Sequence, residues 1–213
     1  MSPAWFLAAS VIGYLLGSLP FGYIVARAHG VDIFKEGSGN PGATNVKRVL
    51  GEKFGAKGRR AGTLVFVLDA LKGALAAAWP ALPLLHAPEA RLLGLIGVIA
   101  AVLGHSFSIF TKFKGGKGVA TAAGGLVVLM PVSCLIGGAV WILTFALTRY
   151  VSLGSVLAAV AVPTASWLRG NPLPFNLVAT AIGLFVIVRH RENIKRLLAG
   201  TETKFAKKPP AQP

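Results

Sequence analysis

The sequence predicts an all-α protein that crosses a membrane seven times, and three observations support this prediction. Of the 213 residues, 54% are hydrophobic and 14% are charged, whereas about 25% charged residues are usual in soluble domains. The mean hydropathy of the chain is +0.66. Uncharged runs of roughly 20 residues, the length that spans a bilayer, recur from end to end and leave no soluble domain of useful size.

The predicted spans follow one another through polar connections. The first run begins without lysine or arginine, which argues against a cleaved signal peptide and for a retained first helix. Pro20 and Gly22 are expected to kink the far end of this helix. A polar loop is expected at residues 27–60 and a turn at 170–174. The predicted spans are residues 3–26, 62–85, 92–111, two helices within 119–148, 151–168 and 175–188.

The uncharged run 119–148 decides both the number of spans and the orientation. It is too long for one ordinary span and short for two, and either Met130-Pro131 or Gly137-Gly138 allows a break. Reading it as two helices places all but three of the 22 lysine and arginine residues on one side of the membrane. Basic residues favour the cytoplasmic side, so the N-terminus is predicted outside and the C-terminus inside. The three exceptions are Lys72, Arg91 and Arg169.

The formal charge of +15 does not indicate a nucleic-acid-binding protein. The basic residues lie between apolar spans, as membrane topology requires, so we predict no nucleic-acid partner. The single cysteine, Cys134, lies in an apolar run and excludes both an internal disulfide and a cysteine cluster for a metal. Asp69 and Lys72 interrupt the second span on one helix face, where they either pair structurally or support a site.

The predicted polar loop contains an unusual segment, residues 37–48, which reads Gly-Ser-Gly-Asn-Pro-Gly-Ala-Thr-Asn-Val-Lys-Arg. Its glycines and proline make a poor helix, and glycine lets backbone N–H groups approach a ligand. The short polar side chains and the planar guanidinium of Arg48 suit a phosphate or a carboxylate. We predict an anion-facing loop here, with an ordinary solvated connector as the alternative.

A second polar segment, residues 112–118, carries three lysines and three glycines. A helix that starts at Val119 would favour an anion at its N-terminus. The spacing of a Walker motif is absent, so the segment indicates a phosphate cradle without nucleotide hydrolysis. A positive-inside loop that holds lipid headgroups is the alternative. His105 precedes this loop by one or two helical turns and is either structural or part of the site.

A third segment, residues 189–198, follows the last span and is strongly basic. An amphipathic helix on anionic lipid is the simplest interpretation. Glu192 is expected to pair with a basic residue one turn further on, while His190 and Asn193 share a helix face. The pair of His190 and Asn193 would then lie at the membrane surface, within reach of a substrate.

The chemistry of the three segments indicates acyl transfer from an activated donor. The acidic residues near them are scattered, which argues against hydrolysis by two carboxylates and against a carboxylate-bound magnesium ion. Ile109 stands four residues after His105, so the His-x-x-x-x-Asp pair of common lipid acyltransferases is absent. Cations, N–H groups, hydroxyls and histidines remain, and these can bind two anions, orient a hydroxyl and stabilise an oxyanion.

Together the three segments resemble those of the bacterial acyl-phosphate:glycerol-3-phosphate acyltransferases, the PlsY family. The likeness runs from the first span to about Glu202, and three long motifs in the same order make it specific. The matching residues are 37–40 with 42–45 and Arg48, 104–105 with 113–121, and 189–194 through 198, with smaller matches at 17–18, 20–22 and 149–153.

The resemblance implies a seven-helix protein of the bacterial cytoplasmic (inner) membrane with its active site on the cytoplasmic face. Residues 1–202 would form one membrane-embedded domain. The implied reaction transfers a fatty acyl group from acyl phosphate to the sn-1 hydroxyl of glycerol 3-phosphate, an early step of phospholipid biosynthesis, without metal or cofactor. The predicted catalytic residues are Ser38, His105 and His190; the predicted substrate-binding residues are Asn40, Thr44, Asn45, Arg48, Lys114, Gly115, Gly116, Lys117, Gly118, Thr121 and Asn193.

We expect a direct reaction between the two substrates. Acyl phosphate would enter from the bilayer with its phosphate held by Lys117, while Arg48 holds glycerol 3-phosphate near His190. The hydroxyl would attack the acyl carbonyl, with Ser38 or an N–H group stabilising the oxyanion. The proton would pass to the phosphate of the donor or to a histidine. No Ser-His-acid array is readable, which disfavours an acyl-serine intermediate.

A membrane transporter or channel for an organic phosphate is the alternative function. The same cationic loops would form an anion vestibule, but this alternative predicts symmetry between the halves, and the sequence contains no inverted repeat. Residues 203–213 are expected to form a disordered C-terminal tail.

Overall fold

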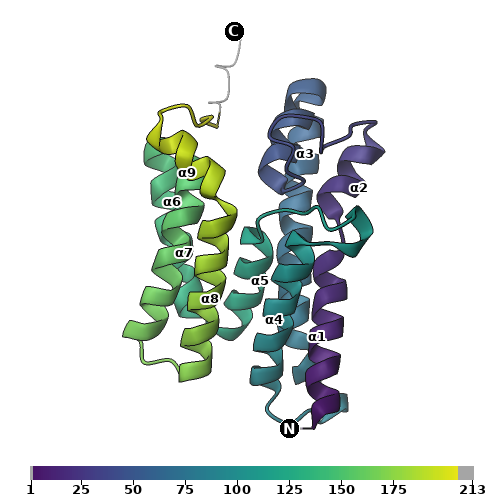
Figure 1. Cartoon of the computed structure of the whole chain (residues 1–213), viewed down its shortest axis with the longest axis vertical. Helices are drawn as coiled ribbons and strands as arrows, with labels where there is room; N and C mark the ends of the chain where they lie inside the picture. The colour runs from purple at the N-terminus through teal and green to yellow at the C-terminus, as the bar shows by residue number, and fades with distance from the viewer. Residues whose placement is uncertain (1, 206–213) are drawn as a thin grey trace.

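The computed structural model describes residues 2–205, and in this range the secondary structure is helical throughout. Successive long helices run in opposite directions, so that the chain begins at one end of the molecule and the last described residues lie at the other (Figure 1). The helices are α1 (Pro3–Ser18), α2 (Phe21–Ala28), α3 (Ala43–Ala78), α4 (Ala90–Ser106), α5 (Val119–Leu129), α6 (Pro131–Thr148), α7 (Val151–Leu168), α8 (Leu173–Arg189) and α9 (Arg191–Leu198), with short 3-10 helices at Trp79–Ala81, Pro83–Leu85 and Ile109–Thr111.

The helices form two groups, α1 to α5 and α6 to α9, which stand side by side (Figure 1). Within the groups, α1 packs along α4, α3 along α5 and α6 along α7. A buried apolar cluster joins the two groups, because Val98 of α4 and Leu126 of α5 belong to the same cluster as Phe175 and Ile182 of α8. This cluster fixes the position of α8, and hence of the segment that follows it, relative to the loop before α5.

Small residues bring α1 and α4 into close contact. A Cβ atom added to Gly13 would lie 2.4 Å from the carbonyl oxygen of Gly97, and one added to Gly17 would lie 2.1 Å from that of Ala101. Helices in membranes associate through such close backbone approach, since lipid provides no hydrophobic force between them. The packing holds the end of α4, where His105 lies, against the end of α1.

The predicted break in the run 119–148 is confirmed. Helix α5 ends at Leu129, and α6 begins at Pro131 after Met130, whose φ of −139° is not helical. Proline fits the first turn of α6 because the N–H group that it lacks would have no partner inside the helix. The two later predicted spans, 151–168 and 175–188, agree with α7 and α8 to within two residues.

The prediction that residues 27–60 form a loop is wrong for more than half of its length. Helix α3 already begins at Ala43, and it reverses at Phe54 and Gly55, whose φ of 57° is left-handed. Glycines let the two halves touch: a Cβ on Gly58 would lie 1.9 Å from the Leu50 carbonyl oxygen, and one on Gly62 would lie 2.3 Å from the Lys47 Cα. These contacts show an antiparallel helical hairpin at the polar end of the molecule.

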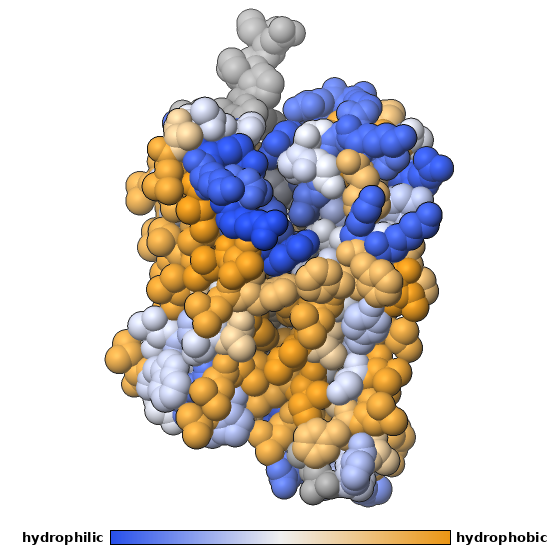
Figure 2. Space-filling model, viewed as in Figure 1, coloured by the Kyte–Doolittle hydropathy of each residue, from blue (hydrophilic) through white to orange (hydrophobic). Residues whose placement is uncertain are grey.

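The distribution of side chains fits a membrane protein. Apolar residues cover the middle of the molecule, and hydrophilic residues gather at the end that carries α9 and the start of α3 (Figure 2). In the described part of the chain, five helices are long and apolar enough to cross a membrane, or six if α8 and α9 count as one bent span. Helix α5, with 11 residues, is shorter than the roughly 20 residues of an ordinary span.

Asp69 and Lys72 form an ion pair, which was one of the two possibilities that the sequence offered. The Lys72 Nζ lies 2.8 Å from Asp69 Oδ1, and each side chain is 3% exposed. Lys72 also donates a hydrogen bond of 2.9 Å to the carbonyl oxygen of Leu19, at the break between α1 and α2. His105 completes the cluster, with its Nδ1 3.6 Å from Asp69 Oδ1. The pair therefore connects α3 with α1 and α4.

The expected C-terminal tail lies partly outside the described residues. Residues 206–213 are not described, and for residues 203–205 the structure shows defined contacts. The Phe205 N–H donates a hydrogen bond of 2.9 Å to the carbonyl oxygen of Arg149, and the Phe205 ring packs edge-on against Phe145. The segment after α9 therefore runs back over the ends of α6 and α7.

Candidate active site

The first polar segment is shaped by two asparagines. Asn45, in the first turns of α3, is buried; its Oδ1 accepts a 3.0 Å hydrogen bond from the Ser38 N–H, and its Nδ2 donates one of 3.0 Å to the Glu36 carbonyl oxygen. Asn40 Oδ1 accepts a 2.8 Å hydrogen bond from the Gly42 N–H and so forms the turn that leads into α3. Both asparagines thus hold the loop in place and leave the Ser38 side chain exposed.

Arg48 follows Thr44 by about one helical turn. Both residues are half-buried near the start of α3. The guanidinium of Arg48 is close enough to Lys117 that its charge contributes to lowering the pKa of that lysine. The cation of the first segment therefore lies near that of the second segment.

The glycines of the second segment serve close packing against the end of α4. A Cβ on Gly115 would lie 2.1 Å from the His105 carbonyl oxygen, and one on Gly116 would lie 2.1 Å from the His105 Nε2. The Gly116 N–H donates its hydrogen bond to the His105 carbonyl, at 3.1 Å. That N–H group is therefore already paired within the protein and does not face a ligand. Gly118, with a φ of 81°, turns the chain into α5.

Arg189, at the end of α8, fastens this loop to the second group of helices. Its Nη2 donates hydrogen bonds to the carbonyl oxygens of Gly115, at 3.3 Å, and Gly116, at 2.8 Å. The guanidinium also stacks over the ring of Phe107, 5.3 Å from its centroid. Arg189 is a functional candidate that the sequence reasoning did not single out, although it opens the third motif.

His190 and Asn193 lie in the turn after α8 and on α9, and both are buried. His190 Nδ1 lies 2.8 Å from the carbonyl oxygen of Val186. Because a carbonyl only accepts, Nδ1 carries the proton and Nε2 carries the lone pair. Burial and the nearby charge of Lys117 lower the pKa of His190 to about 4, so the imidazole is neutral near pH 7. A neutral Nε2 can accept a hydrogen bond or a proton from a hydroxyl.

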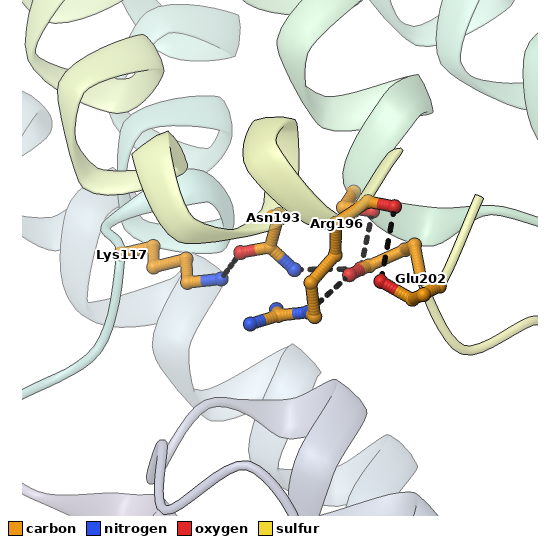
Figure 3. Close-up of polar contacts among 6 residues, drawn as sticks. Lys117, Asn193, Arg196 and Glu202 are labelled. Carbon is orange, nitrogen blue, oxygen red and sulfur yellow. Dashed lines mark hydrogen bonds and ion pairs between the residues drawn. The ribbon is translucent and has the colours of Figure 1, made fainter. Parts of the chain in front are cut away.

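Lys117 meets Asn193 directly, which joins the second and third segments. The Lys117 ammonium donates a hydrogen bond to Asn193 Oδ1, and Asn193 Nδ2 donates one of 2.6 Å to Glu202 Oε1 (Figure 3). Glu202 also accepts hydrogen bonds of 2.7 Å from Arg196 Nε and from Ser152 Oγ. The sequence did not single out Glu202, Ser152 or Arg196 as functional residues. The available signal was Glu202 itself, an acidic residue in an otherwise basic C-terminal segment.

The charges around Lys117 make this end of the molecule an anion site. Burial, together with the positive charges of Arg196, Arg189 and Arg48, lowers the pKa of Lys117 to about 8, while Glu202 opposes the shift. Near pH 7 the ammonium is still mostly charged. In the described residues, no group of three or more His, Cys, Asp or Glu side chains is placed to hold a metal ion. The donors present suit phosphate groups.

His105 lies in a different cluster from His190. It contacts the buried Asp69 and lines a small cavity of ≈ 20 Å³ together with Lys72, Lys114 and Gly116. Lys114 itself is exposed. The structure therefore places His105 beneath the glycine loop, while Lys117, His190 and Asn193 gather beside it.

Thr121 lies in the first turn of α5 and is fully buried. Its hydroxyl makes no hydrogen bond with any described residue. A buried hydroxyl without a partner is costly, which makes Thr121 a candidate to receive a ligand oxygen. This position agrees with its predicted part in the phosphate cradle, which no contact tests directly.

Comparison with known proteins gives one consistent result. The family model described as glycerol-3-phosphate acyltransferase matches residues 7–200. The glycerol-3-phosphate acyltransferase of Synechococcus sp. (strain JA-3-3Ab) is 45% identical over 209 residues, which cover 97% of each chain. That of Aquifex aeolicus (strain VF5) is 43% identical over 197 residues, which cover 92% of this chain and 96% of the relative.

Solved structures agree with these relatives. The crystal structure of PlsY (YgiH), an integral membrane glycerol 3-phosphate acyltransferase, in its glycerol 3-phosphate form aligns with a TM-score of 0.84 at 40% identity. The match covers 94% of this chain and 96% of that one. The lysophosphatidic acid form of the same protein aligns with a TM-score of 0.80.

Proposed function

The chain belongs to the glycerol-3-phosphate acyltransferase family, and from this premise we propose that it transfers a fatty acyl group from acyl phosphate to the sn-1 hydroxyl of glycerol 3-phosphate. The products are lysophosphatidic acid and inorganic phosphate. The observation that carries the proposal is the contact between Lys117 and Asn193, beside the neutral His190 and within the field of Arg48. Cations and a neutral acceptor meet there, as a reaction between a phosphorylated alcohol and an acyl phosphate requires.

Lys117 and Arg48 are the cations that bind the two anionic substrates. Arg48 comes from α3 and Lys117 from the loop before α5, so that each can hold one phosphate while the reacting atoms lie between them. Arginine binds phosphate through two parallel N–H donors, whereas the lysine acts as a point charge. Thr121 and the turn at Gly118 receive an oxygen of the donor's phosphate.

The reaction is a direct displacement at the acyl carbonyl. The oxygen of the sn-1 hydroxyl forms a bond to the carbonyl carbon, and the bond from that carbon to the phosphate oxygen breaks. Ser38, exposed on a loop that Asn45 holds, stabilises the oxyanion. The leaving phosphate takes the hydroxyl proton, so no carboxylate base is needed.

His190 orients the attacking hydroxyl. Before the attack, its Nε2 accepts the hydrogen bond of that hydroxyl, because Nδ1 is committed to the Val186 carbonyl. As the new C–O bond forms, the proton turns to the leaving phosphate. We assign this part to His190 rather than His105, since His105 packs under Gly116 and against Asp69. His105 acts through the loop that it supports.

The orientation follows from the charges. We propose seven crossings, with α5 as a short one, the N-terminus outside and the site on the cytoplasmic face of the bacterial inner membrane. Support comes from the basic residues, which lie at the end of the molecule that holds the site, and from the cytoplasmic preference of such residues. Acyl phosphate then reaches the site from the bilayer and glycerol 3-phosphate from the cytoplasm.

Phosphate release by the purified protein tests this function. Palmitoyl phosphate and glycerol 3-phosphate are mixed with the enzyme without added metal, and the lipid product is identified by mass spectrometry. We expect release that requires both substrates and yields lysophosphatidic acid. Lys117→Ala and Arg48→Ala should each reduce it by about 100-fold or more, since each removes a charged hydrogen-bond donor from a buried anion.

Two exposed cations of α3 serve as matched controls. Lys57→Ala and Arg60→Ala remove the same charges from the surface and should leave the rate unchanged. Palmitoyl-CoA is tested in parallel. Product from palmitoyl-CoA but not from palmitoyl phosphate would overturn the proposed donor, and no product from either would overturn the function.

A further inference from the structure

Glu202 carries a largely enclosed carboxylate that neither the sequence motifs nor the proposed reaction uses. Its side chain is 9% exposed, and burying an ionised carboxylate is costly unless donors surround it. Ser152, Asn193 and Arg196 supply three hydrogen bonds of 2.6 to 2.7 Å. We propose that Glu202 is a positioning residue of the active site, which fixes the amide of Asn193 and, through it, the ammonium of Lys117. This inference rests on the function proposed above.

The orientation of the Asn193 amide depends on Glu202. An amide has one end that donates and one that accepts, and an ionised carboxylate only accepts. Glu202 Oε1 therefore binds the Nδ2 end of Asn193 and turns the Oδ1 end toward Lys117 (Figure 3). With the opposite orientation, the amide NH2 group would face the ammonium, donor against donor. Glu202 thus selects the one amide orientation that can hold Lys117.

The backbone around Glu202 is held on both sides. Its N–H donates to the Arg196 carbonyl oxygen at 3.2 Å, and Gly200, with a φ of 68°, ends α9 just before it. Three residues further on, Phe205 is bonded to the Arg149 carbonyl, and the Lys47 ammonium lies 5.8 Å from its ring centroid. The carboxylate is therefore anchored to the ends of α7 and α9 rather than free to leave the site.

Glu202 also acts on Lys117 through its charge. Among the described residues, the charged groups that act on Lys117 are Arg48 of α3, Arg189 of α8, Arg196 of α9 and Glu202. His190, which is neutral, lies beside them. Among them Glu202 is the one anion. Hydrogen bonds from Ser152, Asn193 and Arg196 outweigh the effect of burial and lower the pKa of Glu202, which is thus ionised near pH 7. Removal of this charge lowers the pKa of Lys117 further below its usual value.

The test is Glu202→Gln, which keeps the shape of the side chain and removes the charge. The new amide can offer its NH2 group to Asn193, which then rotates and presents a donor to Lys117. We expect the KM for palmitoyl phosphate, whose phosphate Lys117 holds, to rise by about tenfold or more at pH 7. We also expect the fall of kcat/KM at alkaline pH to begin at a lower pH than in the wild type, a shift that a purely structural role would not cause.

Glu192→Gln is the matched control. Glu192 lies on α9 and is 60% exposed, paired with Arg191 and Lys195. Its substitution should leave both the KM and the pH profile unchanged. An unchanged KM and pH profile in Glu202→Gln would overturn the proposal. If Glu202→Gln does not fold, Ser152→Ala removes one anchor of the carboxylate and must change both quantities in the same direction; an unchanged profile there overturns the proposal.

A second measurement separates this inference from the proposed function. The rate at which an amine-reactive ester modifies Lys117 is followed against pH by peptide mass spectrometry, with no substrate present. The midpoint should lie at a lower pH in Glu202→Gln than in the wild type and in Glu192→Gln. A wild type that forms no lysophosphatidic acid but shows this shift would sink the acyltransferase assignment alone, and an active wild type with equal midpoints would sink the role of Glu202 alone.

Discussion

At the scale of single residues, the behaviour of the site depends on how burial changes Lys117. Lysine is usually charged up to about pH 10. In this site burial and three arginines lower the pKa of Lys117 to about 8, so the group that binds an anion loses its charge just above neutral pH. The same environment keeps His190 neutral. The site thus combines a cation and an uncharged acceptor a short distance apart.

The pH dependence of activity follows from Lys117. Its pKa is lowered, so the ammonium is present below about pH 8 and lost above it. We expect kcat/KM for palmitoyl phosphate to fall by about tenfold per pH unit above roughly pH 8.5. Lys117→Arg keeps its charge in this range and should remove the fall, even if its rate at pH 7 is lower. Equal alkaline slopes in both proteins would contradict this assignment.

The part played by His190 can be read from a glutamine variant. Glutamine accepts a hydrogen bond but takes no proton. If His190 orients the hydroxyl and the leaving phosphate takes the proton, His190→Gln should retain more activity than His190→Ala, with kcat lowered by less than about 100-fold. The kcat of each variant is measured at saturating substrate. If both variants lose the same amount of kcat, and more than about 100-fold, His190 would instead be the base.

At the scale of elements, the loop before α5 is defined by what it packs against. Gly115 and Gly116 pack directly against the last turn of α4, and a side chain at either position would collide with His105. Arg189 of α8 donates hydrogen bonds to the carbonyl oxygens of both glycines. Lys117 comes next in the chain. The position of its ammonium is therefore set by α4 and α8 together, rather than by the loop alone.

Gly115→Ala should move Lys117 and abolish most of the activity. The new Cβ would lie 2.1 Å from the His105 carbonyl oxygen, a backbone atom of α4 that has little freedom to shift. A displacement of about 1 Å at a catalytic group can cost roughly 100-fold in rate, and we expect a loss of this size in the phosphate-release assay. The control is Gly138→Ala on α6, where a Cβ meets nothing within 4 Å. A fully active Gly115→Ala enzyme would disprove this account of the loop.

The buried pair Asp69–Lys72 links α3 to α1 and α4. Asp69→Asn leaves the ammonium of Lys72 buried without its carboxylate, so we expect the free energy of unfolding in detergent to fall by about 3–5 kcal/mol. Adding Lys72→Met removes the stranded charge and should restore much of the loss. Glu192→Gln, at an exposed ion pair, should change stability by less than about 1 kcal/mol. A double variant that is less stable than Asp69→Asn would refute this reading.

At the scale of the whole molecule, two groups of helices meet so that three distant segments share one end. Arg48 of α3 and Lys117 of the loop before α5 belong to the first group and Asn193 of α9 to the second, and the contact between Lys117 and Asn193 joins the groups. The buried cluster around Val98, Leu126 and Ile182 holds the groups together. The active site is thus a property of the assembled bundle, with its polar end in water and its apolar sides in lipid.

The orientation of the bundle gives a prediction about the two ends of the chain. In a Cys134→Ala background, Ser2→Cys and Thr203→Cys each place one thiol at an exposed position. A membrane-impermeant maleimide should label Ser2→Cys in intact spheroplasts and Thr203→Cys only after the membrane is opened, because basic residues hold the C-terminal side in the cytoplasm. Labelling of both positions from outside would mean an even number of crossings.

Much of the fold was readable from the sequence because the signals are local. Apolar runs predicted the long helices, and one of the two predicted breaks, Met130-Pro131, separates α5 from α6. Motifs of glycine, lysine and histidine pointed to the three segments of the candidate site. The hairpin within α3 was misread. Polar and glycine-rich composition suggested a loop, although Val46, Val49 and Leu50 recur at helical spacing and are buried.

Other features were decided by tertiary packing alone. Nothing local to Glu202 indicates that its carboxylate meets Asn193, or that His105 lies with Asp69 while His190 lies with Lys117. Propensities and motif spacing act over a few residues, whereas Asn193 and Glu202 are nine residues apart and the other two pairs are separated by tens of residues. The sequence by itself determined a helical membrane bundle whose basic residues gather at one end; the packing of its helices decided which cation, amide and carboxylate touch, because only the folded bundle fixes those distances.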